Sequence, residues 1–269
     1  MKYKIPFSGR AHFYTKEEQD TVIEVMQKAT TLTQGVYQES FQNQFCNFIG
    51  VHYAFALNNA TSALVLSAQL CQFKTDEEVI IPSHTYTASA YPFLRQGAKI
   101  VWADIDSSER VVTPETIEAC ITNKTKAIVV VHLYGYCADM PEIMRLAKKY
   151  NLLVIEDCAQ AIGAKINGKM VGSFGDFGVF SFHSHKNIST LGEGGMLTVK
   201  DKKFAKIIPL LRHHGHCDFD FERKKYWLPA MGNLDFPELN SEKIWPNNFC
   251  LGEVECALGE KLLDRVELM

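Results

Sequence analysis

Residues 152–161, LLVIEDCAQA, place two acidic residues directly after an apolar run. A short apolar run of this kind is typical of a strand that is covered on both faces, as in a parallel sheet. Asp157 at the carboxyl end of such a strand would face the crevice in which open α/β sheets bind ligands. An Asp that only caps the next helix is the alternative. The stretch predicts a central strand with Asp157 beside a ligand site.

The same pattern repeats on both sides of this stretch. From about residue 50 to residue 200, short apolar or β-branched runs alternate with longer amphipathic segments, which indicates strand–helix units around a mostly parallel central sheet. The expected strands are 53–57, 78–81, 99–103, 127–131, 152–156, 177–182 and 195–198. We therefore expect an α/β fold with helices on both faces of the sheet, in one large domain over residues 1–250.

Helix starts are marked by capping residues. Thr15 with Glu18 reads as a capping box, Thr113 precedes a proline that can occupy the first helical position, and Asp139 is a third N-cap. The first helix has apolar residues that we expect to form one packed face. They are Val22, Ile23, Val25 and Met26.

Residues 251–269 read as a helix without a C-cap. We expect this segment to begin an interdomain helix that leads to a C-terminal small domain absent from the 269 residues, so that the sequence looks like a truncated product. Its apolar positions are Val254, Ala257, Leu258, Leu262 and Val266.

The bulk composition excludes several classes of protein. The 269 residues are 46% hydrophobic and 22% charged, with a net charge of -3, which is ordinary for a globular protein and gives no basic field for nucleic acid. We see no membrane-spanning run and no secretory signal, and we expect a cytoplasmic protein with small-molecule partners. None of the eight cysteines forms a C-x-x-C pair, so reduced thiols are expected.

Two further motifs follow predicted strands. Residues 58–64, NNATSAL, open a helix whose free N–H groups suit a phosphate, with Thr61 and Ser62 as added donors, although both are also ordinary capping residues. Residues 181–187, SFHSHKN, carry Lys186 from an apolar strand into a loop before the glycine-rich 192–195. Partial burial would lower the pKa of Lys186 and make its amine a nucleophile, whereas a solvated loop lysine is the alternative.

In this order, the three motifs resemble the DegT-type nucleotide-sugar aminotransferases, which are fold-type I enzymes dependent on pyridoxal 5'-phosphate (PLP). The resemblance extends to residues 5–6, 32–35, 81–86 and 131–135. It implies that Lys186 holds PLP as a Schiff base and moves the proton, and that Asp157 pairs with the pyridinium nitrogen. The other cofactor contacts that it implies are Gln160 with the ring oxygen, Tyr86 stacked on the ring, Thr61, Ser62 and Ser181 at the phosphate, and Asn248 reaching the phosphate of a neighbouring subunit.

The resemblance also implies an activity. It is transamination of a keto sugar linked to a nucleoside diphosphate, with glutamate as amino donor, for surface polysaccharides such as lipopolysaccharide, by a homodimer with a shared active site. Ala60 departs from the glycine that the family often has in the phosphate turn.

Three other functions stay open at this point. A sugar dehydratase of the same fold can arise when histidine replaces the Schiff-base lysine, and Lys186 argues against that route. A weakly active PLP-binding fragment is the second. A metal hydrolase is the third, since residues 212–217, RHHGHC, gather three histidines and a cysteine, but adjacent ligands converge poorly on one metal, and we expect none.

Overall fold

The computed structural model describes residue 10, residues 12–215 and residues 244–269. Its centre is a seven-stranded sheet in the order β1-β9-β8-β5-β4-β2-β3. The strands are β1 (Tyr53–Leu57), β2 (Glu78–Pro82), β3 (Lys99–Ala103), β4 (Thr125–Val131), β5 (Leu153–Asp157), β8 (Phe177–Ser181) and β9 (Gly195–Val199). Each predicted strand is confirmed to within two residues at either end.

The sheet is mostly parallel, as predicted. Strands β3, β2, β4, β5 and β8 run parallel, and β9 pairs antiparallel with both β8 and β1. Strand β1 therefore points the same way as the parallel strands, and β9 alone among these seven runs in the opposite direction. A two-stranded ribbon, β6 (Lys165–Ile166) and β7 (Lys169–Met170), lies beside the sheet.

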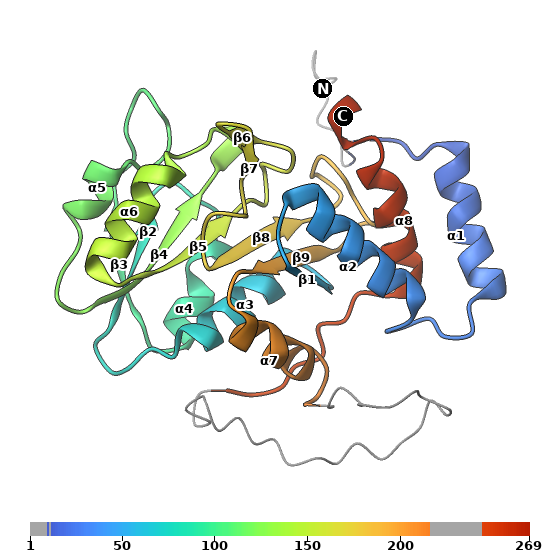
Figure 1. Cartoon of the computed structure of the whole chain (residues 1–269), viewed down its shortest axis with the longest axis horizontal. Coiled ribbons are helices and arrows are strands. Elements are labelled where there is room, and N and C mark those ends of the chain that lie inside the picture. The colour runs from blue at the N-terminus through green and yellow to red at the C-terminus, as the bar shows by residue number, and fades with distance from the viewer. Residues whose placement is uncertain (1–9, 11, 216–243) are drawn as a thin grey trace, which may run out of the picture.

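Helices cover both faces of the sheet (Figure 1). On one face lie α3 (Ala60–Cys71), α4 (Tyr91–Arg95) and α7 (Lys202–Arg212), which share a core with Val79 and Val129. The other face is covered by α2 (Val36–Ile49) and α8 (Glu253–Leu263) at one end and by α5 (Pro114–Glu118) and α6 (Met140–Tyr150) at the other. Neighbours in a strand alternate between the two cores, since Ile80 and Ile128 lie in the second face's core.

The predicted helix starts are confirmed. Helix α1 (Lys16–Lys28) begins with the capping box of Thr15 and Glu18, and Thr113 and Asp139 accept hydrogen bonds from the first turns of α5 and α6. Each cap satisfies a backbone N–H that has no partner within its helix.

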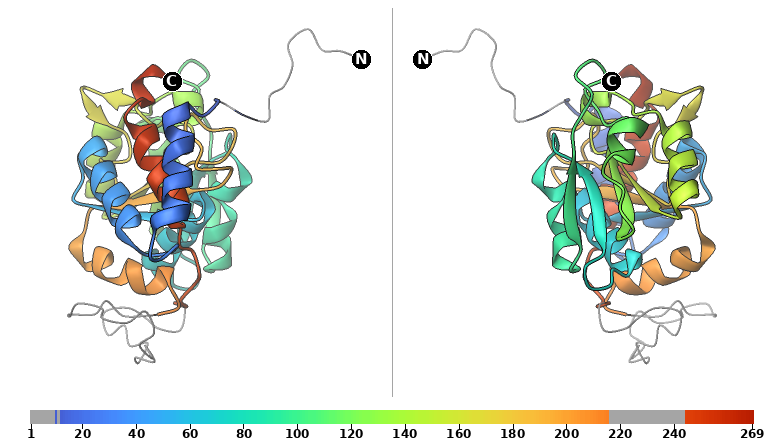
Figure 2. Two further views of the ribbon diagram at one scale, coloured as in Figure 1. Left: turned by 90° about the vertical axis from the view of Figure 1, so that its right-hand side faces the viewer. Right: turned by 90° about the vertical axis from the view of Figure 1, so that its left-hand side faces the viewer.

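The predicted packed face of α1 is partly wrong. Val25 is buried, but Ile23 and Met26 are 48% and 66% exposed. Helix α1 packs against α8, beside which it lies in Figure 2, and a single packed helix covers only a narrow stripe of its neighbour.

The predicted helix 251–269 is shorter in the structure. Gly252 has an extended backbone as the N-cap, α8 ends at Leu263, and a 3₁₀ turn (Val266–Leu268) follows. Glu253 at the start of α8 accepts hydrogen bonds from the N–H groups of Gly35, Tyr37 and Gln38, which joins α8 to the start of α2.

Two smaller predictions concern thiols and membranes. The seven cysteines among the described residues are free thiols, as expected, and Cys217 lies outside the described residues. Within the described part of the chain, no helix has the length and apolar character needed to cross a bilayer.

Candidate active site

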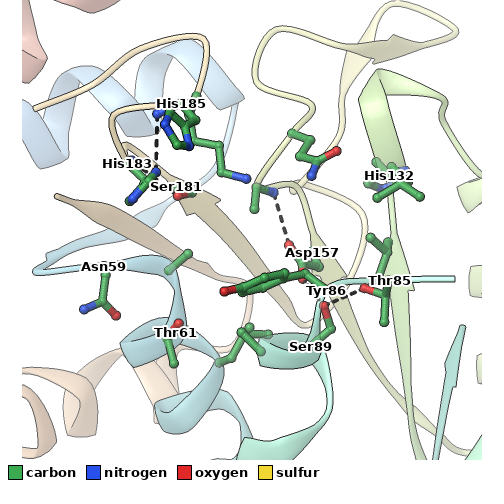
Figure 3. Close-up of a pocket in the computed structure, with 18 of the residues that line it drawn as sticks. Asn59, Thr61, Thr85, Tyr86, Ser89, His132, Asp157, Ser181, His183 and His185 are labelled. Atoms are coloured by element: carbon green, nitrogen blue, oxygen red, sulfur yellow. Dashed lines mark hydrogen bonds between the residues drawn. The ribbon is translucent and has the colours of Figure 1, made fainter. Parts of the chain in front are cut away.

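A cavity of about 450 Å³ lies at the carboxyl ends of β1, β2, β4, β5 and β8. Figure 3 shows its lining, which joins segments that are far apart in the sequence. Six of the eight predicted site residues line it: Thr61, Tyr86, Asp157, Gln160, Ser181 and Lys186. The carboxyl edge of the sheet is where open α/β folds bind ligands, so the cavity is in the expected place.

Asp157 is the buried acid of this cavity, with 6% of its surface exposed. Ser89 donates a hydrogen bond to Oδ2 across 2.7 Å, and the backbone N–H of Ala159 donates to Oδ1 across 3.1 Å. Burial raises the pKa of Asp157, while these two donors and the charge of Lys186 oppose the rise. The pKa is therefore set by a balance in which a cationic group nearby favours the carboxylate.

Lys186 reaches the cavity from the loop between β8 and β9, which we call the lysine loop (residues 182–194). Burial lowers the pKa of its amine and the charge of Asp157 opposes this, so the predicted direction is confirmed. Hydrogen bonds inside the loop run from Lys186 N to His183 O (2.8 Å) and from Thr190 N to Phe182 O (3.1 Å). The amine is thus presented by an ordered backbone.

The start of α3 forms another wall of the cavity. Asn59 is its N-cap and accepts a hydrogen bond from Ser62 N, and the Thr61 side chain lines the cavity. The hydroxyl of Ser62 instead donates to Asn58 Oδ1 across 2.7 Å, so the structure does not bring Ser62 into the cavity. A Cβ at Gly195 would lie 2.5 Å from the carbonyl carbon of Asn59, which shows how closely β9 approaches this turn.

Gln160 is held by its oxygen. The backbone N–H of Tyr134 donates to Gln160 Oε1 across 3.0 Å, and Tyr134 has a positive φ of 55° that directs this N–H. The amide oxygen is engaged, so the NH₂ group of Gln160 is the part that can donate to a ligand.

The remaining predicted residues differ in position. Ser181 is buried at the end of β8, while Tyr86 lines the cavity with 72% of its surface exposed. Asn248 is exposed and does not line the cavity, and its backbone bridges to His213. Because the resemblance assigns Asn248 to a neighbouring subunit's site, its role stays a prediction, as does that of Ser62.

Sequence reasoning missed the groups that support Asp157. Ser89 lies in a 3₁₀ turn (Thr87–Ser89) after β2, and no local pattern connects it to an acid on β5. Glu156 and His132 were also missed, although Glu156 adjoins Asp157 and His132 lies in the matched segment 131–135. The available signal was Glu156, a charged residue within a strand predicted to be buried, since a buried charge needs partners.

Glu156 is the most satisfied of these buried groups. Its carboxylate accepts backbone N–H bonds from Gly172 (2.8 Å), Phe174 (2.8 Å) and Gly175 (2.7 Å), and its Oε2 lies 3.3 Å from His132 Nε2. The N–H of Ala138 donates to Nδ1 of His132, so Nε2 carries the proton of the neutral ring. The network ties His132, which lines the cavity, to the segment between β7 and β8.

The metal-site alternative gains no support from the described residues. The potential ligands that cluster there are His132, Glu156 and Cys158, and Glu156 and His132 are already engaged in the hydrogen bonds above. His213 lies 3.1 Å from the side chain of Gln34. His216 and Cys217 of the RHHGHC segment lie outside the described residues, as do residues 5–6.

Comparison with known proteins gives one consistent result. GDP-perosamine synthase of Caulobacter vibrioides is 39% identical over 250 residues, which cover 93% of this chain and 62% of that protein. An aminotransferase from Psychrobacter cryohalolentis has the same fold with a TM-score of 0.85 and 35% identity, over 97% of this chain and 64% of that one. A Streptococcus pneumoniae protein, solved in a PLP form, matches with a TM-score of 0.79 and 26% identity, over 99% of this chain and 68% of that one.

The chain thus spans about three-fifths of the length of the first two of these proteins. The profile of one family matches nearly all of it, over residues 13–269. The fold, the order of the motifs and this match agree, and the chain belongs to the DegT/DnrJ/EryC1/StrS aminotransferase family.

Proposed function

We propose that the protein binds PLP in this cavity and transfers an amino group to a keto sugar linked to a nucleoside diphosphate. The observation that carries the proposal is the pairing of Asp157 and Lys186 across one cavity at the carboxyl edge of the sheet. The Streptococcus pneumoniae protein solved in a PLP form, which has this fold, supports the choice of cofactor.

The donor groups of the cavity fit PLP. The buried carboxylate of Asp157 suits a protonated pyridine nitrogen, and the NH₂ group of Gln160 suits the ring oxygen. The start of α3 offers N–H groups and the Thr61 hydroxyl to the phosphate, and Ser181 lies on the same cavity. Tyr86, at the open side, is placed to cover a ring face.

Two side chains of this protein then carry the chemistry. When bound, the protonated ring accepts the electron pair released as a C–H bond beside the amino nitrogen breaks. The lowered pKa of Lys186 leaves more of its amine uncharged, so Nζ would be the nucleophile that holds PLP through its aldehyde, with release of water, and the base that would take and return the proton. The hydrogen bonds from Ser89 and the N–H of Ala159 favour the charged form of Asp157 and oppose the rise in pKa that burial causes.

For the substrates, the comparisons support a class of compound and not a particular sugar. The relative named GDP-perosamine synthase and one named dTDP-3-amino-3,6-dideoxy-alpha-D-galactopyranose transaminase favour a nucleotide sugar. Four further points stay predictions. They are glutamate as amino donor, a homodimer with Asn248 in the shared site, a cytoplasmic location and a further domain after α8. Lys186 lies in the cavity, which favours amino transfer over the dehydratase route that replaces the lysine.

The test is reductive labelling. After incubation with PLP and borohydride, peptide mass spectrometry should locate a pyridoxyl group on Lys186, and Lys186→Ala should lose it. Lys202→Ala is the matched control, because Lys202 is exposed at the start of α7 and does not line the cavity. Labelling elsewhere in the wild type, or unchanged labelling in Lys186→Ala, would contradict the proposal. Glutamate-dependent amination of nucleotide-linked keto sugars then tests the substrate class.

A further inference from the structure

The segment before α1 is bound to the lysine loop. His12 Nε2 accepts a hydrogen bond from Ser189 N across 3.0 Å. The hydroxyl of Tyr14 donates to Ser189 O across 2.9 Å and accepts from Leu191 N across 3.2 Å. These three bonds join residues about 175 positions apart in the sequence, at a site three to five residues after Lys186.

The lysine loop needs such external support. Leu191 has a φ of 62° and Gly192 a φ of 115°, and the left-handed region is unfavourable for a residue with a branched side chain such as leucine. Inside the loop, Gly192 N donates to the Ser189 hydroxyl across 3.2 Å and Ser184 N donates to Gly192 O across 3.0 Å. A displacement of residues 189–191 would therefore move Gly192, and Gly192 is bonded to Ser184, two residues before Lys186.

We propose that His12 and Tyr14 are positioning residues for Lys186: they hold the lysine loop in the conformation that directs the amine into the cavity. This inference rests on the proposed function of Lys186. Four residues that line the cavity belong to the same loop, His183, His185, Lys186 and Glu193, so its conformation shapes one whole wall.

The surroundings of His12 suit an acceptor. Its ring meets the edge of the Tyr14 ring, Arg265 Nη2 lies 3.5 Å from Nδ1, and the charges of Glu18 and Arg10 act on it. Burial and the charge of Arg265 lower the pKa of His12, while a backbone hydrogen bond with Phe13 and the charge of Glu18 oppose this. A neutral ring at neutral pH leaves Nε2 able to accept from Ser189, and protonation in acid would remove the acceptor.

Amide hydrogen exchange of the protein without cofactor tests the contact directly. We expect the Ser189 amide in His12→Ala and the Leu191 amide in Tyr14→Phe to exchange about three- to tenfold faster, because each loses its acceptor. The Thr190 amide, bonded to Phe182, is the internal reference. Phe13→Leu is the matched control, since the Phe13 side chain is 77% exposed. Wild-type protection of both amides in the variants would overturn the proposal.

A pH series separates an acceptor role for His12 from simple packing. In the wild type, the protection factor of the Ser189 amide should fall as pH is lowered and His12 is protonated. His12→Gln supplies an acceptor that does not titrate, so its Ser189 protection should stay level over the same range. A parallel acid loss in His12→Gln would contradict the acceptor role.

The positioning role is read at Lys186 itself. In the double variant His12→Ala/Tyr14→Phe, we expect reductive labelling of Lys186 by PLP and cyanoborohydride to slow by at least about tenfold, because a small displacement of a reacting group has a large effect on rate. The Lys186 amide, bonded to His183 O, should also lose protection. Unchanged labelling and an unchanged Lys186 amide would overturn the positioning role. Absence of labelling in the wild type would instead contradict the proposed function, and the amide exchange would still decide the role of the two residues.

Discussion

Ser89 donates a hydrogen bond of 2.7 Å to Asp157, although Ser89 follows β2, Asp157 ends β5 and the two residues are 68 positions apart. The hydroxyl of Thr85 lies 2.8 Å from that of Ser89, so the donor is itself held in place. Both Ser89 and Asp157 are buried. For the acid that we assign to the cofactor nitrogen, a neighbour from the β2 end of the sheet therefore opposes the rise in pKa that burial causes.

Removal of that neighbour should change the pH dependence of activity. In Ser89→Ala the pKa of Asp157 should rise further, because burial still disfavours the carboxylate and one donor is lost. The acid limb of the rate profile should then move to higher pH, so the rate falls more at pH 6 than at pH 8. Ser89→Thr keeps a hydroxyl and should restore the profile. Identical profiles for wild type and Ser89→Ala would contradict the role given to Ser89.

Replacement of the acid itself should have the larger effect. Asp157→Asn keeps the shape but cannot hold a proton on the ring nitrogen by charge, so amino transfer should fall by at least about 100-fold. Asp176→Asn is the control for a partly buried carboxylate, since burial also raises the pKa of Asp176 but its contact is with Val154 N at the other end of β5. Near wild-type half-reactions in a folded Asp157→Asn protein would show that Asp157 is not the partner of the ring.

Gln160 offers a test of the cofactor's orientation. Gln160→Glu keeps an oxygen for Tyr134 N but replaces the NH₂ donor with a second oxygen. We expect PLP affinity to fall at least about tenfold, because one hydrogen bond worth about 1.4 kcal/mol is lost and the new carboxylate repels the ring oxygen. Equilibrium titration of PLP followed by absorbance measures this. Equal affinity in the variant would mean that the NH₂ group makes no contact with the cofactor.

Glu156 should matter for stability more than for chemistry. Glu156→Gln puts an NH₂ group where backbone N–H groups now donate, and we expect the free energy of unfolding to fall by about 3 kcal/mol. Urea unfolding measures the loss. Glu118→Gln, at an exposed carboxylate bonded to Lys149, should leave the unfolding free energy nearly unchanged. Comparable losses in the two variants would contradict the role of the buried network.

Much of this architecture could be predicted from the sequence because strands and caps are local signals. Apolar runs placed every central strand, and residues at or just after the carboxyl ends of those strands, such as Asp157 and Lys186, meet at one edge in any parallel sheet. The order of the strands supplies what the local signals lack. Only this order brings the turn of Ser89 beside Asp157, which no spacing rule could indicate.

The errors also have physical reasons. The exposure of Met26 depends on how many elements pack against α1, and the spacing of apolar residues in a helix does not predict that number. The predicted phosphate contact of Ser62 stays a prediction, and in this structure the Ser62 hydroxyl donates to Asn58 Oδ1 instead. Competition between equally local hydrogen bonds is decided by side-chain rotamers, which the sequence leaves open.

The reversed direction of β9 has a consequence for ligand affinity. Because β9 begins at the edge where β8 ends, the lysine loop leaves and re-enters the sheet at the same edge, and both of its ends are fixed to neighbouring strands. Loops after β4 and β5 in the same sheet lead away to other elements. A loop closed in this way loses most of its conformational entropy when the chain folds. Ligand binding then has little further entropy to remove from the loop, which favours affinity. The lysine is in this sense preorganised, and the free energy of folding rather than that of association carries the cost.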